Sequence, residues 1–214
     1  MRKLRNYPKY EDDYNWRLYP QQYAQQLIDI SKEHTLVLTS DNYEMIDGGI
    51  HMKGGFSPMH PQHKLLYETI IDLSPEDIHE VGCGRGNHLA NINMLSNGAI
   101  KTYGSDISEE QLKDLRADHP QFAGNVAQVN IVQNSVMSCD IVFTQAVLMH
   151  LSDSNLEKAI INISISAKRT ILIMEGFKRR DYKTIFKRIN PMGWENSQIE
   201  EISREDAGII IISK

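Results

Sequence analysis

The sequence has 214 residues, of which 41% are hydrophobic and 24% charged, with a formal net charge of -5. This composition is typical of a globular protein with one large domain, and the acidic balance argues against a nucleic-acid-binding surface, which usually leaves a basic footprint. Two cysteines, Cys83 and Cys139, are too few for a disulfide framework or a zinc site, and no apolar run is long enough to cross a bilayer. We therefore expect a cytoplasmic protein with no metal, no membrane segment and no nucleic-acid partner.

The first sixty residues are polar and rich in tyrosine. Residues 7–27 carry five tyrosines and Trp16, which is too aromatic for a free tail. Residues 46–56 are rich in glycine and are typical of a flexible hinge or loop. We expect residues 1–60 to form an extension of a main domain that spans residues 61–214.

Strand and helix patterns alternate through the rest of the chain. Helices are predicted at 62–73, 87–96, 108–119, 152–167 and about 179–189, and strands at 77–82, 100–106, 126–132, 139–147 and 170–176. Two further apolar segments near the end of the chain are typical of a β-hairpin. The alternation predicts an α/β fold, in which helices cover both faces of a mostly parallel sheet and the hairpin adds an antiparallel pair at one edge.

A glycine-rich turn follows the first of these strands, in the sequence HEVGCGRGNH. Gly82, Gly84 and Gly86 alternate there, and glycine accepts positive φ and lets the backbone approach a ligand closely. A mononucleotide-phosphate loop would need Lys and then Ser or Thr after the last glycine, where Asn87 and His88 stand. A dinucleotide-binding turn would need a sixth-place glycine where Asn87 stands, so this alternative is weakened but stays open.

Polar residues also follow the other strands of the predicted sheet. The carboxyl ends of parallel strands form the ligand cleft of such folds, so the glycine turn, Asp106, Asn130 and Gln145 should lie together. Asp106 could accept hydrogen bonds from both hydroxyls of a ribose, although a helix-capping role is the alternative. Glu80 lies within the first strand, where a buried carboxylate is unfavourable unless paired, so we expect it to orient the loop or a ligand.

Three further residues could surround an adenine ring. Ile107 could pack on the face of the ring, or it could simply belong to the core. Asn130 or Ile131, at the end of the third strand, could bound the ring on another side. The register of that strand decides which of the two does so.

Three segments resemble one known family. EVGCGRG, YGSDIS and CDIVFTQAVLMHL are similar to segments of class I, Rossmann-like S-adenosylmethionine-dependent methyltransferases, and the resemblance covers roughly residues 62–176. It implies a seven-stranded sheet, S-adenosylmethionine as cofactor and S-adenosylhomocysteine as product. It also implies that the glycine turn and Gln145 lie near the methionine moiety and that Asp106 binds the ribose. Where the family often has an acid for the adenine amino group, this chain has Asn130.

Histidines are the candidate general bases, since their pKa lies near neutral. His150 is the first candidate, because many small-molecule methyltransferases of this family have a similar histidine that faces the acceptor pocket. Fixing the local turn is its alternative role. His60 and His63 are the next candidates, with exposed surface positions as their alternative.

The aromatic extension has a counterpart in related small-molecule enzymes, where a segment before the first helix closes over cofactor and substrate. The resemblance therefore implies that Tyr14, Tyr19 and Tyr23 belong to a lid. Packing against the domain, or a homodimer contact through the same aromatic residues, is the alternative.

The resemblance implies methyl transfer to an O or N atom of a small polar acceptor. LMHLSDSNLEKAI and SAKRTILIMEG are similar to methyltransferases found with bacterial surface-sugar biosynthesis, which suggests a sugar, a nucleotide-sugar or a glycan-modifying group. The alternatives are an RNA or protein methyltransferase, a non-catalytic partner subunit that keeps the cofactor pocket, and a dinucleotide-dependent reductase.

Overall fold

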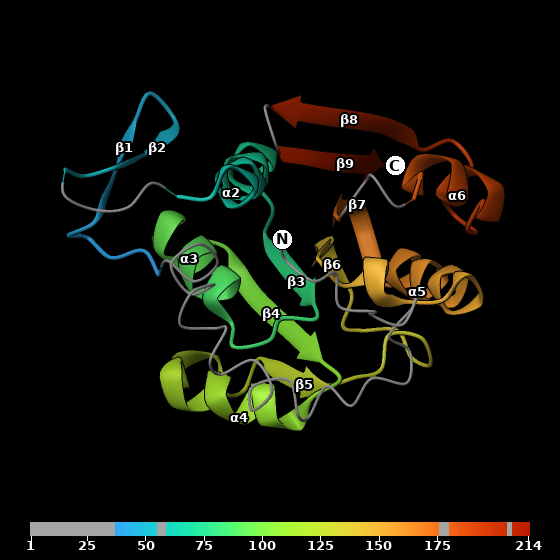
Figure 1. Cartoon of the computed structure of the whole chain (residues 1–214), viewed down its shortest axis with the longest axis horizontal. Coiled ribbons are helices and arrows are strands. Elements are labelled where there is room, and N and C mark those ends of the chain that lie inside the picture. The colour runs from blue at the N-terminus through green and yellow to red at the C-terminus, as the bar shows by residue number, and fades with distance from the viewer. Residues whose placement is uncertain (1–36, 55–58, 176–179, 205–206) are drawn as a thin grey trace, which may run out of the picture.

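The computed structural model of the chain describes residues 37–54, 59–175, 180–204 and 207–214 (Figure 1). Its centre is a seven-stranded sheet in the order β5-β4-β3-β6-β7-β9-β8. The strands are β3 (Asp77–Val81), β4 (Lys101–Asp106), β5 (Val126–Gln128), β6 (Cys139–Gln145), β7 (Ala167–Met174), β8 (Gln198–Arg204) and β9 (Ala207–Ser213). All neighbours are parallel except β7–β9 and β8–β9. The predicted sheet is therefore confirmed, and the terminal hairpin inserts β9 between β7 and the edge strand β8.

Helices cover both faces of this sheet. Figure 1 shows the first three on one side and the last two on the other. They are α2 (Pro61–Leu73), α3 (Asn87–Leu95) and α4 (Glu109–Asp118), then α5 (Asp153–Ser166) and α6 (Tyr182–Ile189). Short 3-10 helices lie at η2 (Pro120–Phe122) and η3 (Leu148–His150). Within the described ranges, none of the helices is long and apolar enough to span a membrane.

The terminal strand β9 has four consecutive isoleucines, and its position in the sheet explains them. Ile209 and Ile211 pack with α2 and α3, whereas Ile210 and Ile212 pack with α5 and α6. Successive side chains of a strand point to opposite faces, so a strand covered on both sides needs apolar residues throughout. The same alternation holds in β6 and β7, and it divides the core into one layer on each side of the sheet.

The predicted boundaries agree with the structure to within three residues except at the third strand. β5 ends at Gln128, whereas the sequence pattern predicts a strand over residues 126–132. The reason is local, because Oδ1 of Asn130 accepts a hydrogen bond from the amide of Val132 at 3.0 Å and starts a turn. Asn130 and Ile131 therefore lie in the loop beyond the strand and do not end it.

The expectation of a flexible loop at residues 46–56 is wrong for its described part. β1 (Tyr43–Ile46) and β2 (Gly49–Met52) form an antiparallel hairpin through Asp47 and Gly48, both of which have positive φ. Asp-Gly is a preferred pair for such two-residue turns. Ile50 of β2 is buried in the core layer that contains α2. Tyr14, Tyr19 and Tyr23 lie outside the described residues, so the lid and the domain boundary at residue 60 stay predictions.

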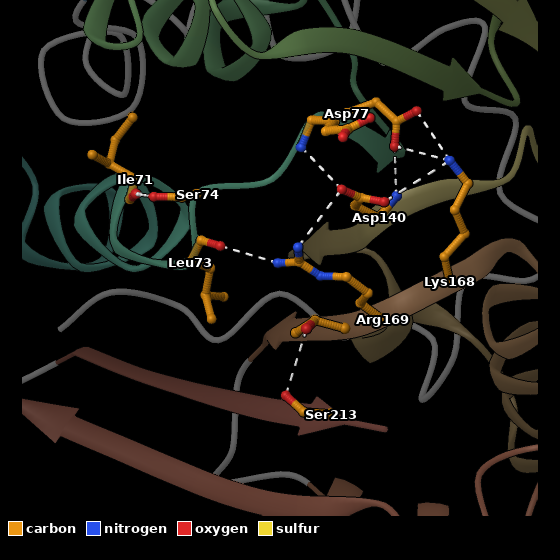
Figure 2. A network of polar contacts seen from close by, with 10 residues as sticks. Ile71, Leu73, Ser74, Asp77, Asp140, Lys168, Arg169 and Ser213 are labelled. Carbon is orange, nitrogen blue, oxygen red and sulfur yellow. Dashed lines mark hydrogen bonds and ion pairs between the residues drawn. The ribbon is translucent and has the colours of Figure 1, made fainter.

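The amino ends of the central strands are joined by charged side chains (Figure 2). Oδ1 of Asp77 accepts a hydrogen bond from the amide of Asp140 at 2.6 Å, and Oδ2 of Asp140 accepts one from the amide of Glu76 at 2.9 Å. Lys168 of β7 lies 3.2 Å from Oδ2 of Asp77, and Arg169 donates to the carbonyl of Leu73. This network ties β3, β6, β7 and the end of α2 together.

Candidate active site

The glycine turn follows β3 at the opposite, carboxyl edge of the sheet. Gly82, Gly84 and Gly86 have φ of +75°, +51° and +78°. A Cβ on Gly82 would overlap Cγ2 of Val147, and one on Gly86 would lie 2.7 Å from Cδ1 of Leu115. Gly82 and Gly86 are thus required by close packing within the protein.

Gly84 differs from the other two glycines because its missing side chain faces open space. The nearest atom to a Cβ built there is Oε1 of Gln111, at 4.0 Å. Its amide donates to Oδ2 of Asp106 at 2.9 Å, and Oδ1 of Asp106 accepts from the amide of Ser108 at 2.8 Å. Asp106 therefore joins the glycine turn to the end of β4, and the predicted meeting of these two segments is observed.

Most amides of the turn are used inside the protein. Those of Gly82 and Cys83 both donate to the carbonyl of Ser105, at 2.7 and 2.9 Å, and that of Gly86 donates to the carbonyl of Cys83 at 2.8 Å. Phosphate-binding turns instead direct amides at the ligand. With the Gly84 amide also occupied by Asp106, the turn is poorly suited to a pyrophosphate.

Glu80 lies in β3, two residues before Gly82, and is 1% exposed. Its Oε2 has no hydrogen-bond partner among the residues that the structure describes. Burial raises its pKa well above the usual range, and the nearby carboxylate of Asp106 raises it further. Burial also raises the pKa of Asp106, although its backbone hydrogen bonds oppose that shift. A buried acceptor without a donor, next to a second carboxylate, is suited to a cationic ligand.

The turn after β6 forms another wall of this region. Gln145 ends β6 and is partly buried, and Ala146 next to it has a φ of +55°. His150 lies in η3 and is also partly buried, with its amide bonded to the carbonyl of Val147 at 3.1 Å. Val147 is the residue that packs against Gly82. Gln145 and the glycine turn therefore lie on adjacent segments, as predicted.

Sequence reasoning did not find Glu175, which directly follows β7. Its carboxylate is 3% exposed and accepts hydrogen bonds from the amides of Val147, Leu148 and Met149, at 3.0, 3.0 and 3.1 Å. A carboxylate at the end of the apolar strand ILIME was the available signal, and it is the same signal that identified Glu80.

The three residues predicted around an adenine differ in their surroundings. Ile107 is 44% exposed next to Asp106, which leaves its face open to a ligand. Ile131 is buried in the core layer on the α5 side, and its carbonyl accepts from Asn162 at 2.7 Å. The side-chain oxygen of Asn130 is engaged in its own turn. Their roles toward an adenine stay predictions.

Histidines gather where α2 and α3 begin. His60 caps α2, since its Nδ1 accepts from the amide of Gln62 at 3.3 Å. His63 is buried, with ring centroids 5.2 Å from His60 and 4.7 Å from His88. Nδ1 of His88 lies 2.7 Å from the hydroxyl of Tyr67. The involvement of Tyr67 and His88 was not predicted, because it depends on the packing of α2 against α3.

These features fit S-adenosylmethionine, whose sulfonium and ammonium groups are cationic and which has no phosphate. The unpartnered oxygen of Glu80, the carboxylate of Asp106 and the open space at Gly84 are the parts that fit. Within the described residues no His, Cys, Asp or Glu cluster is arranged to hold a metal ion.

Comparison with known proteins identifies the domain. Residues 78–169 match a family described as a methyltransferase domain. This segment is a methyltransferase domain, and the chain has the Rossmann-like fold of S-adenosylmethionine-dependent methyltransferases. The matched segment of the methyltransferase starts in β3 and contains the glycine turn, Asp106, Gln145 and His150. No curated protein matches the sequence.

Solved structures share the fold of this methyltransferase. A TehB-like S-adenosylmethionine-dependent methyltransferase from Corynebacterium glutamicum has a TM-score of 0.58 at 15% identity, over 92% of this chain and 98% of its own. The magnesium protoporphyrin IX methyltransferase from Synechocystis with bound S-adenosylmethionine has a TM-score of 0.52 at 17% identity, over 70% and 76%. A candidate O-methyltransferase from Nostoc punctiforme has a TM-score of 0.56 at 12% identity, over 71% of this chain, which spans only 55% of the Nostoc protein. These identities are so low that the likenesses show the fold alone.

Proposed function

We propose that the enzyme transfers a methyl group to an O or N atom of a small polar acceptor, with a sugar or a glycan-modifying group as the first choice. The observation that carries the cofactor site is the buried carboxylate of Glu80 and the partly buried carboxylate of Asp106, beside a glycine turn whose amides are largely occupied. The choice of acceptor rests on the net charge of -5, which disfavours nucleic acid, and on the sequence resemblance.

When bound, S-adenosylmethionine supplies a methyl group on a positively charged sulfur, and the acceptor atom must approach in line with that sulfur. Glu80 and Asp106 provide the negative potential that favours the cation. Gly84 leaves the space for it, and Gln145 borders the same region. Most of the acceleration then comes from holding the reactants in position.

A base must take the proton that the acceptor loses, and His150 is the proposed base. It lies in the turn that directly follows Gln145, so it belongs to the same wall of the site. His60 is the second choice, because its Nδ1 already accepts the hydrogen bond that caps α2. Tyr14, Tyr19 and Tyr23 are proposed to close over the bound molecules as a lid.

Calorimetric titration with S-adenosylhomocysteine and with NADH tests the cofactor assignment. We expect binding of S-adenosylhomocysteine only, and binding of NADH alone would contradict the proposal. Asp106→Ala should weaken S-adenosylhomocysteine binding by about 1.5–3 kcal/mol, the range for hydrogen bonds to a charged group. Unchanged affinity in a folded variant would exclude Asp106 from the site.

Incubation with labelled S-adenosylmethionine and a panel of sugars, nucleotide-sugars and metabolite extracts tests the acceptor. Transfer of label to a small molecule is the expected result. Label on RNA or protein, or cofactor binding without transfer to any acceptor, would overturn the proposed acceptor class.

A further inference from the structure

The carboxylate of Glu175 accepts backbone hydrogen bonds at the point where the pairing between β6 and β7 ends. The ladder between β6 and β7 runs to the pair Gln145 and Met174, and the amide of Ala146 still donates to the carbonyl of Met174 at 3.0 Å. Beyond that point the carboxylate of Glu175 accepts from the next three amides, those of residues 147–149. These are the donors that a 3-10 helix leaves without a partner at its start. No side chain within the η3 segment itself caps them.

The carboxylate is held in an environment that disfavours its charge. Burial raises the pKa of Glu175, while the hydrogen bonds from Leu148, Val147 and Met149 oppose the shift. A neutral group at this position would avoid the burial penalty but would leave buried amides without a charged acceptor. We therefore explain the buried carboxylate by its function in the turn, where it holds the amides of residues 147–149 in place.

The same turn is held from its carbonyl side by Arg180. Its Nη1 donates to the carbonyl of Leu148 at 3.1 Å, and its Nη2 donates to the carbonyl of Leu151. The Arg180 side chain is 8% exposed, so these bonds are largely shielded from water. Glu175 and Arg180 thus fix the two polar sides of the segment from Val147 to Leu151, which contains His150.

The segment from Val147 to Leu151 packs directly against the glycine turn. Val147 donates its amide to Glu175, and its side chain fills the space where Gly82 has no Cβ. Ala146, beside it, holds a left-handed φ of +55°, a conformation that a non-glycine residue keeps only when its surroundings enforce it. A shift of the turn would therefore move one wall of the cofactor site directly.

We propose that Glu175 is a positioning residue of this methyltransferase: it sets cofactor affinity and the placement of Gln145 and His150 by clamping the segment from Val147 to Met149 against the glycine turn. This inference rests on the proposed function, since it assumes that the glycine turn receives the cofactor. Arg180 assists from the carbonyl side of the same segment.

The test uses Glu175→Gln and Glu175→Ala in the full chain. The amide oxygen of Gln can keep the bonds from Val147 and Leu148, but its NH2 group then opposes the amide of Met149. We expect dissociation constants for S-adenosylhomocysteine that rise in the order wild type, Gln, Ala, with Ala weaker by at least about tenfold, and faster hydrogen exchange at the amides of residues 147–149.

Ser166→Ala is the matched control. Ser166 is the last residue of α5, directly before the amino end of β7, and its Oγ accepts from the amide of Val136 at 3.0 Å and donates to its carbonyl at 3.1 Å. The variant removes a comparable contact between a side chain and a loop, far from the site. We expect it to lower the midpoint of urea unfolding and to leave cofactor affinity and the exchange of amides 147–149 unchanged.

The outcomes separate the inference from the function on which it rests. Wild-type affinity in folded Glu175→Gln and Glu175→Ala would overturn the positioning role. An equal loss of affinity in Ser166→Ala would also overturn it, because the loss would then follow from lower overall stability. If Glu175→Ala does not fold, Glu175→Gln and Val147→Ala carry the test, and wild-type affinity in both overturns the inference. A wild-type enzyme that does not bind S-adenosylhomocysteine would instead overturn the proposed function.

Discussion

At the amino ends of the strands, the carboxylate of Asp77 lies 3.2 Å from the ammonium group of Lys168, in a network that water reaches. At the carboxyl ends, Glu80 and Glu175 are buried, and neither has a cationic partner among the described residues. The first edge has the chemistry of a stable surface, in which charges are paired and partly solvated. The second keeps charges where they are unfavourable, and such departures from stability mark functional sites. Buried carboxylates without cations therefore identify the site more sharply than the glycine turn alone.

Gly82→Ala should have the largest effect on stability. The left-handed φ costs about 1–2 kcal/mol for an alanine, and the overlap with Val147 adds about 1–3 kcal/mol, so a loss of about 2–5 kcal/mol is expected in urea unfolding. Gly84→Ala is the control within the same turn. It should lose only about 1–2 kcal/mol because its Cβ faces open space, yet it should weaken S-adenosylhomocysteine binding. Equal losses of stability in the two variants would contradict the different roles assigned to these glycines.

The sequence predicted most of the fold because its information there is local. Helix α4 begins after Ser108, whose side chain accepts from the amide of Gln111, and α2 begins at Pro61, both as their sequence patterns indicate. The central strands β6 and β7 contain the apolar runs IVF and ILIM, which are typical of buried strands. The predictions that failed concern short polar segments: the hairpin turn at Asp47 and Gly48, and the end of β5, where one side-chain hydrogen bond decides the boundary.

Less of the candidate site could be predicted, because it depends on contacts between distant segments. The meeting of Gly84 and Asp106 follows from strand order and was expected. The clamp by Glu175 joins residues 26 to 28 positions apart, and the pairing of Tyr67 with His88 joins two helices. Sequence patterns place such residues near an edge of the sheet, but side-chain packing selects their partners.

Asp77→Ala should lower stability without affecting the site. The substitution leaves the amide of Asp140 without its acceptor at 2.6 Å, and a buried donor left without a partner costs about 1–3 kcal/mol. Urea unfolding measures this loss, and calorimetry with S-adenosylhomocysteine should give the wild-type dissociation constant. A changed dissociation constant would show that the two edges of the sheet are coupled.

Glu80→Gln should act in the opposite direction, raising stability by about 0.5–2 kcal/mol at neutral pH while weakening cofactor binding. The pKa of Glu80 is raised in the folded state, by burial first and by Asp106 second. Below the ordinary glutamate pKa, the group is protonated in both states and contributes no pH-dependent difference. As the pH rises from that value through the raised pKa, the unfolded chain loses its proton first, so the folded state becomes progressively less favoured.

Unfolding of the wild type and Glu80→Gln at several pH values measures this difference. The free energy of unfolding of the variant should rise relative to that of the wild type as the pH rises through that window. In acid, the two free energies should differ least. A variant that is less stable than the wild type at every pH would mean that the Glu80 carboxylate is a structural acceptor, and its unpartnered oxygen would no longer point to a cationic ligand.

Lys168→Ala should have the smallest effect, although it removes a charge that contacts Asp77 at 3.2 Å. Its side chain is 47% exposed, so solvent and salt screen the pair. The hydrogen bond to Asp77 raises the pKa of Lys168, so its contribution is complete at neutral pH and is lost only in strongly alkaline solution. We expect a slight loss in urea unfolding at low salt that disappears at high salt. If Lys168→Ala lowers the free energy of unfolding as much as Asp77→Ala does, the exposed ion pair stabilises this edge. A smaller loss would mean that the hydrogen bond between the Asp77 carboxylate and the Asp140 amide stabilises it.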